Sequence, residues 1–142
     1  MIQFQYKYPG FKIKTARKVK SWLAIVARGE KKKIRTLMYV FVNDEELLQI
    51  NRNSLKHDYY TDIITFPYSY DPIETEIFIS VDRVADHALK YKVRADEEMA
   101  RILVHGLLHM CGYSDKSKIK KTEMTGREDY WIKKLKKLMD FT

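Results

Sequence analysis

The spacing of hydrophobic residues changes along the first part of the chain, and each change predicts a different element. Strict alternation over Ile2–Tyr6 predicts a first strand. From Ile13 to Arg28 the apolar positions recur every three or four residues, which predicts a helix with Lys and Arg on its outer face. The aromatic-rich run Ile34–Val42 predicts a second strand. A capping Asn43 followed by acidic residues predicts a helix that extends to about Ser54.

Strands and helices continue to alternate in the middle of the chain. Tyr59–Tyr68 has the composition of a strand, and Pro67 is expected to mark its end. Glu76–Val81 is expected to be a strand buried on both faces, because its polar positions do not alternate cleanly. Asp82–Tyr91 predicts a short helix, and the next helix should run from Arg94 to about Met110.

The pattern near the C-terminus predicts the central element of the fold. From Met99 to Met110 the chain is apolar nearly all round, so this helix should be central and buried. A last helix is predicted from Lys118 to Leu138. The expected fold class is therefore α/β (α+β), a small mixed β-sheet packed against helices, with a central buried helix. The positions of the last helix expected to point inward are Ile119, Met124, Tyr130, Trp131, Leu135 and Leu138.

Length and composition limit the class of protein. The chain has 142 residues, which suits one domain over residues 1–142, and 45% of them are hydrophobic, enough to build a core. No apolar stretch approaches the ~20 residues that span a bilayer, and the first residues lack the basic start and apolar block of a signal peptide. A single cysteine, Cys111, excludes an internal disulfide framework. We therefore expect a cytoplasmic protein.

The balance of charges adds a class of partner. Lys and Arg number 27 against 19 Asp and Glu, so the formal net charge is +8. This charge favours a polyanionic partner such as RNA, DNA or a membrane surface. A basic protein without such a partner could carry the same charge, so the charge alone does not show that the protein binds a polyanion. A candidate binding or catalytic site is needed to distinguish the two cases.

The candidate chemistry lies in Val104–Lys116, which reads V-H-G-L-L-H-M-C-G-Y-S-D-K. His105 and His109 are four residues apart in the apolar helix, so both imidazoles project from one face. Gly112 favours the end of the helix and a turn, which allows Asp115 to return beneath that face. Two imidazoles and one carboxylate suit a divalent transition metal and leave one position open for water.

Other interpretations of this stretch stay open. Two histidines at this spacing can be core or capping residues with no ligand. A zinc protease would have H-E-x-x-H with Glu as the general base, but Gly106 follows the first histidine here. Cys111 lies two residues after His109 and is a candidate soft ligand, although a free cysteine is more often a small buried residue.

The segment His105–Asp115 resembles the H-G-x-L-H-x-x-G-Y-D-H signature of the YbeY family, the bacterial metal-dependent endoribonucleases that mature rRNA. Two further segments match. Tyr60–Pro67 is similar to the family's P-T-D/N-V-L-S-F-P strand, and Glu76–Ser80 is similar to its G-D-I-x-I-S strand. The resemblance covers roughly residues 34–130.

The resemblance implies a zinc ion held by His105 and His109, with Asp115 in place of the family's usual third histidine. Because a carboxylate adds negative charge, the bound water should be less acidic, and other metals such as manganese become acceptable. The family also has an Arg before its T-D strand, and that position falls on Leu55. The remaining candidate basic helpers or contacts to nucleic acid are Arg52, Lys56 and Lys116.

The resemblance further implies a function. We expect a single-strand-preferring endoribonuclease that acts on small-subunit (16S) rRNA precursors, in 3′-end maturation and ribosome quality control. The metal would polarise the scissile phosphate and activate water, while basic residues hold the backbone. One alternative is a non-catalytic ribosome-assembly factor with a structural metal. Another is a zinc hydrolase of a different substrate, which would need a carboxylate such as Glu76 or Glu98 at the metal. The oligomeric state and the general acid are left open.

Overall fold

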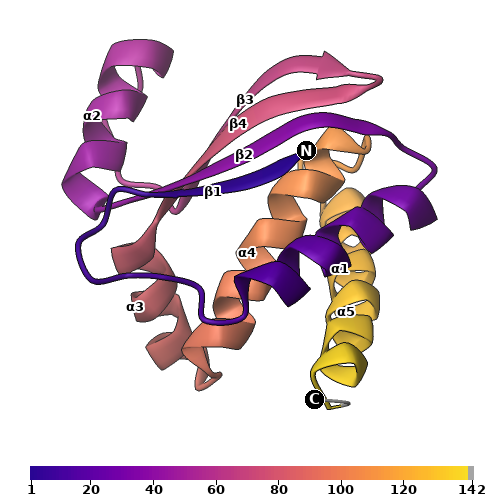
Figure 1. Cartoon of the computed structure of the whole chain (residues 1–142). Coiled ribbons are helices and arrows are strands. Elements are labelled where there is room, and N and C mark those ends of the chain that lie inside the picture. Colours follow the sequence, from indigo (N-terminus) through magenta and orange to yellow (C-terminus); the bar gives the residue numbers. More distant parts are fainter. Residues whose placement is uncertain (141–142) are drawn as a thin grey trace.

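In the computed structural model, which describes residues 1–140, four strands form one sheet and five helices surround it (Figure 1). In chain order the elements are β1 (Ile2–Tyr6), α1 (Ala16–Gly29), β2 (Ile34–Val42), α2 (Asp44–Leu55), β3 (Ile63–Tyr70), β4 (Ile73–Ser80), α3 (Val81–Tyr91), α4 (Ala95–Met110) and α5 (Lys118–Asp140).

The sheet is mixed, as the sequence predicts. Its strand order is β1-β2-β4-β3. β1, β2 and β4 are parallel neighbours, while β3 pairs with β4 in the antiparallel sense. A tight turn joins β3 to β4, and helices make the crossovers between parallel strands. The α/β prediction is therefore confirmed.

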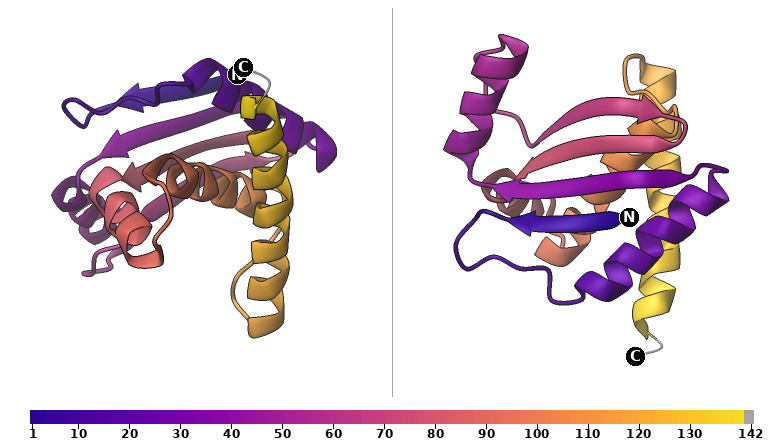
Figure 2. Two further views of the ribbon diagram at one scale, coloured as in Figure 1. Left: turned by 90° about the horizontal axis from the view of Figure 1, so that it is seen from below. Right: turned by 45° about the horizontal axis from the view of Figure 1, so that its top comes forward.

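Four helices cover one face of the sheet. α1, α3, α4 and α5 lie below it in Figure 1, and α2 lies against one end of the opposite face. Figure 2 shows α4 crossing beneath the strands with α5 beside it. The side chains that β2 and β4 turn toward α4 are fully buried, namely Leu37, Tyr39, Phe41, Ile73, Ile77 and Ile79. α4 is the central buried helix that the sequence predicts.

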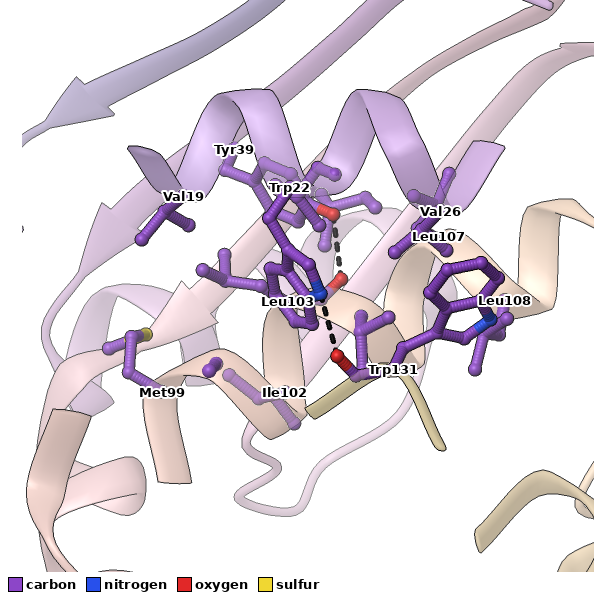
Figure 3. Close-up of a cluster of buried hydrophobic side chains, with 14 of the residues drawn as sticks. Val19, Trp22, Val26, Tyr39, Met99, Ile102, Leu103, Leu107, Leu108 and Trp131 are labelled. Atoms are coloured by element: carbon purple, nitrogen blue, oxygen red, sulfur yellow. Dashed lines mark hydrogen bonds between the residues drawn. The ribbon is translucent and has the colours of Figure 1, made fainter. Parts of the chain in front are cut away.

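Two buried hydrogen bonds fix one helix against the sheet and two other helices against each other (Figure 3). The Tyr39 hydroxyl on β2 donates to the Leu103 carbonyl of α4 at 2.7 Å. The Trp22 indole on α1 donates to the Trp131 carbonyl of α5 at the same distance. Both donors are large aromatic residues whose polar atoms need partners when buried. α4 is thereby held against β2 two residues before His105.

The strand boundaries differ from the prediction at Pro67. β3 begins at Ile63 and continues through Pro67 to Tyr70, with a register shift between Pro67 and Ser69. β3 is an edge strand, where a residue without an N–H removes no ladder hydrogen bond on the open side. β4 starts earlier than expected, and its outward residues Glu74, Glu76 and Phe78 are only half-buried.

The inward face of α5 also differs from the prediction. Met124, Trp131 and Leu135 are buried as expected, but Ile119, Tyr130 and Leu138 are exposed, and Ile132 is buried instead. The first turns of α5 extend beyond the other helices (Figure 2), and Ile119 in the first turn is 81% exposed. No helix within residues 1–140 combines the length and hydropathy needed to cross a bilayer.

Candidate metal centre

The structure brings the three predicted ligands together at the C-terminal end of α4. The Nε2 atoms of His105 and His109 lie 3.1 Å apart. Asp115 Oδ2 lies 3.8 Å from His105 Nε2 and 3.7 Å from His109 Nε2. One ligand atom from each residue falls within 4.8 Å of the other two.

The end of α4 explains how Asp115 reaches the histidines. The Tyr113 N–H donates to the Leu108 carbonyl at 3.0 Å, and Gly112 has a φ of +106°. A positive φ just after the last helical turn is the reversal that glycine permits at low cost. The chain therefore turns back beneath α4, as Gly112 predicts, and carries Asp115 to the open side of the imidazoles.

The opposite ring nitrogens of both histidines have fixed partners. His105 Nδ1 lies 2.6 Å from Oε2 of Glu128, and His109 Nδ1 lies 3.1 Å from the Tyr113 carbonyl. A carboxylate and a carbonyl only accept, so each Nδ1 holds a proton. The two Nε2 lone pairs and the Asp115 carboxylate then face one another with no donor among them. Three converging acceptors fit a divalent cation.

A positive charge on one imidazole disfavours protonation of the other. Burial lowers the pKa of His105, but the hydrogen bond and charge of Glu128 outweigh it, so that pKa is raised. Burial, together with the neighbouring His105, lowers the pKa of His109. The two shifts have opposite directions, so the two imidazoles do not become charged together.

Glu128, on α5, is a site residue that the sequence reasoning missed. Its side chain is buried, and its second oxygen accepts from Arg101 at 3.0 Å. Arg101 in turn donates to Asp129 at 2.7 Å. The signal was present, because Glu128 falls on the same face of α5 as buried Met124 and Trp131. A carboxylate on an apolar face needs a partner, as the histidines of α4 do.

A cavity of about 290 Å³ opens beside the histidines, between α3, α4 and α5. Asp62 precedes β3 and lies in its wall, 3.7 Å from His87 Nδ1 of α3. Burial raises the pKa of the Glu98 carboxyl, which also faces this space. The cationic side chains in the wall are Arg101 and Lys121.

The other predicted residues lie elsewhere. Arg52 forms an ion pair with Asp58, and Lys56 caps the end of α2, and neither lines the cavity. Lys116 is exposed next to Asp115 but is not part of the wall. Their roles in binding RNA stay predictions. Leu55, at the position of the family's Arg, is partly exposed on α2.

The structure also shows where the alternative metal ligand and the alternative carboxylates lie relative to the site. Burial raises the pKa of the Cys111 thiol to about 12, and Cys111 is not part of the ligand group. Glu76 accepts from the Tyr68 hydroxyl at 2.5 Å and does not line the cavity, whereas Glu98 does. The resulting group has three protein ligands, the number typical of an open site.

Gly106 has a packing role that explains the missing protease base. A Cβ at this position would lie 3.0 Å from Cδ1 of Ile77 and 3.2 Å from Cδ1 of Ile63. The side chain at position 106 would therefore point at the sheet and away from the imidazoles. A Glu here would have no room, so H-E-x-x-H chemistry does not fit this helix.

Comparison with known proteins agrees with this site. A family model described as Endoribonuclease YbeY matches residues 2–136. Endoribonuclease YbeY of Cytophaga hutchinsonii is 46% identical over 121 residues, covering 84% of this chain and 85% of that protein. The protein of the same name from Flavobacterium psychrophilum is 40% identical over 134 residues, covering 94% and 95%.

The fold has a counterpart among solved structures. The solution structure of a Thermotoga maritima protein superimposes with a TM-score of 0.69 and 21% identity, covering 95% of this chain and 89% of that one. This likeness supports the mixed sheet and its helices. The sequence matches, which extend over nearly the whole chain, place this protein in the YbeY family of endoribonucleases.

Proposed function

We propose that this protein is a metal-dependent endoribonuclease that cleaves single-stranded RNA in small-subunit (16S) rRNA precursors, with roles in 3′-end maturation and ribosome quality control. The proposal is supported by family membership and by one observation in particular. The two Nε2 atoms and the Asp115 carboxylate converge with acceptors only, beside a cavity that is open to a ligand.

The residues have distinct roles in this proposal. His105, His109 and Asp115 hold the cation, and Glu128 and the Tyr113 carbonyl orient the two imidazoles through their Nδ1 protons. A bound divalent ion would supply a Lewis acid for the phosphodiester and a water of lowered pKa. We propose Zn²⁺, with another transition metal such as Mn²⁺ as an alternative because Asp115 is an oxygen ligand.

The remaining cavity residues would hold the substrate. Lys121 is the cation in the wall that forms no ion pair among residues 1–140, so it is free to meet a phosphate. Arg101 is committed to Glu128 and Asp129. Glu98, whose carboxyl pKa is raised by burial, is the group best suited to hold a proton near the leaving oxygen.

The test is cleavage of a 16S precursor RNA by purified protein with and without a chelator. We expect chelation to abolish cleavage, and Zn²⁺ or Mn²⁺ to restore it. A folded His109→Ala protein should lose cleavage, whereas His57→Ala, which changes an exposed histidine that does not line the cavity, should retain it.

Two outcomes would contradict the proposal. Cleavage that persists in the chelator would exclude the metal mechanism. Ribosome binding that is equal in the wild type and His109→Ala, with no cleavage by either, would instead indicate an assembly factor with a structural metal.

A further inference from the structure

The positive charge of this protein is concentrated in one part of the chain. Residues 1–42 contain eleven Lys and Arg and a single acidic residue, Glu30, whereas residues 43–142 contain sixteen Lys and Arg against eighteen Asp and Glu. The first segment therefore carries a net charge of +10 and the rest carries −2. The part of the chain that supplies the metal ligands is not the basic part.

Little within the fold neutralises this charge. The Glu30 side chain is only 9% exposed and pairs with Arg127 of α5. Among the eleven cationic residues of the segment, Arg35 is the one that forms an ion pair within residues 1–140, with Glu74 at 3.5 Å. The other ten form no ion pair with the described residues, so this segment attracts a polyanion.

Four of these cations line a single groove, which we call the basic groove. Lys20, Arg28, Lys32 and Lys33 surround an open space of about 570 Å³ between α1 and the start of β1 and β2. The rest of its lining consists of Ser21, Ala24 and Ala27 of α1 and of the apolar residues Met1, Ile2 and Ile34, and no carboxylate lines it. Figure 2 shows α1 running beside β1, which is the open edge of the sheet on this side.

The backbone holds the basic groove in a defined shape. After α1 the Lys32 N–H donates to the Ala27 carbonyl at 2.8 Å, and the Lys33 carbonyl accepts from the Ile73 N–H at 2.8 Å. Two of the four cations are thus carried by a turn tied at both ends, to α1 and to β4. Such a turn fixes the backbone from which these two side chains extend, so little backbone freedom is lost when a ligand binds.

A side-chain bridge connects this turn to the metal-site loop. Glu30, two residues from both Arg28 and Lys32, accepts from the Tyr113 hydroxyl at 2.9 Å. Tyr113 lies two residues before Asp115, and its carbonyl holds His109. The basic groove and the metal centre therefore belong to one linked framework, although the groove and the cavity share no lining residue.

We propose that the basic groove binds the sugar-phosphate backbone of the RNA substrate at nucleotides outside the catalytic cavity. The inference rests on the proposed function, since it takes RNA as the polyanion. The groove contains no aromatic side chain on which a base could stack, so the contact is to phosphates and independent of sequence. A membrane surface fits less well, because the apolar face of α1, with Trp22, Leu23 and Val26, is buried in the core.

The test measures RNA affinity as a function of salt in chelated protein, so that no cleavage occurs. The groove variant combines Lys20→Gln, Arg28→Gln, Lys32→Gln and Lys33→Gln. The control variant removes the same charge from exposed lysines elsewhere, through Lys90→Gln, Lys92→Gln, Lys133→Gln and Lys137→Gln. Fluorescence anisotropy would follow a labelled single-stranded RNA of about 24 nucleotides and one of about 6, because the longer strand offers phosphates to the cavity and to the groove at once.

We expect the groove variant to bind the long RNA roughly tenfold or more weakly at 0.1 M salt. The slope of log K against log salt should fall by about 3, since each single-strand phosphate contact contributes about 0.7. The difference between the two variants should be smaller for the short RNA, because it offers fewer phosphates. Should the fourfold variant not fold, the pairs Lys20→Gln/Arg28→Gln and Lys32→Gln/Lys33→Gln should each lower the slope by about 1.4.

Equal slopes and affinities for the groove and control variants would overturn the inference, even if the wild type cleaves RNA with metal. If the groove variant binds the long RNA more weakly than the control but the wild type never cleaves RNA, the groove would still be an RNA-binding site and the proposed nuclease activity would be rejected. A third arm uses vesicles of phosphatidylcholine and phosphatidylserine. Loss of vesicle binding in the groove variant with unchanged RNA binding would assign the groove to a membrane and overturn the inference.

Discussion

Glu128 and His105 lie 23 residues apart in the chain, yet Oε2 of Glu128 is 2.6 Å from Nδ1 of His105. The contact joins α5 to α4 at the metal centre, and it leaves His105 Nε2 as the free lone pair. Arg101 accompanies the carboxylate, so the buried charge is compensated. The orientation of the first ligand thus depends on a helix that supplies no ligand itself.

Replacement of that carboxylate should weaken the metal centre. We expect Glu128→Gln to lower Zn²⁺ affinity by about 10- to 100-fold, because the amide does not fix the Nδ1 proton as a carboxylate does. Competition with a chromogenic chelator would measure this. Asp129→Asn is the matched control, since Asp129 contacts the same Arg101 from an exposed position. Equal Zn²⁺ affinity in the two variants would show that Glu128 does not orient His105 as a metal ligand.

The identity of the third ligand should set metal preference. Asp115→His would replace a carboxylate with the neutral imidazole of the family signature, which favours Zn²⁺ over harder ions. We expect the ratio of Zn²⁺ to Mn²⁺ affinity to rise by roughly tenfold. Titration calorimetry on wild type and variant would measure both ions. An unchanged ratio would show that Asp115 does not touch the cation.

Two helical glycines should respond to alanine with opposite signs. Gly106→Ala forces a methyl group against Ile77 and Ile63 at a cost of about 2 kcal/mol, because Ile77 is fully buried and has little room to shift. This cost exceeds the gain of about 1 kcal/mol in helix propensity. Gly126→Ala on α5 meets no neighbouring atom and should gain about 1 kcal/mol. Urea unfolding of the chelated proteins would give both values. Stabilisation by Gly106→Ala would contradict the close helix–sheet contact.

Glu30 should make the free energy of unfolding depend on pH in the acidic range. Burial raises its pKa, but hydrogen bonds from Arg127, Trp131 and Tyr113 outweigh burial, so the folded pKa is lowered below 4.5. A carboxyl with a depressed folded pKa contributes stability above its unfolded pKa, and this contribution is lost as the pH falls through the folded pKa. At neutral pH we expect the free energy of unfolding of Glu30→Gln to be about 2 kcal/mol lower than that of the wild type.

Urea unfolding of chelated wild type and Glu30→Gln across a pH series would measure this dependence. The gap between the two free energies of unfolding should be constant near neutral pH and shrink below about pH 4.5. Glu123→Gln, an exposed change on the same helix as Arg127, is the control. A gap that is independent of pH would show that folding does not lower the pKa of Glu30.

The sequence was informative wherever the signal is local. The boundaries of β1 and β2, the end of α4 before Gly112, and the common face of His105 and His109 depend on spacing within one element. The expectation of one domain over residues 1–142 stays a prediction. By contrast, Pro67 was wrongly expected to end its strand, because only the sheet order makes β3 an edge.

By itself, the sequence determined the helix that carries the histidines, the return of the chain at Gly112 and the excess of cations in its first third, because backbone preferences and charge are local properties. The tertiary structure alone decided that Glu128 meets His105, that Glu30 meets Tyr113, and that Lys20 and Lys33 share a groove. Those contacts depend on how α1 and α5 pack on α4. Such packing follows from the combined burial of side chains from many elements, and no single segment encodes it.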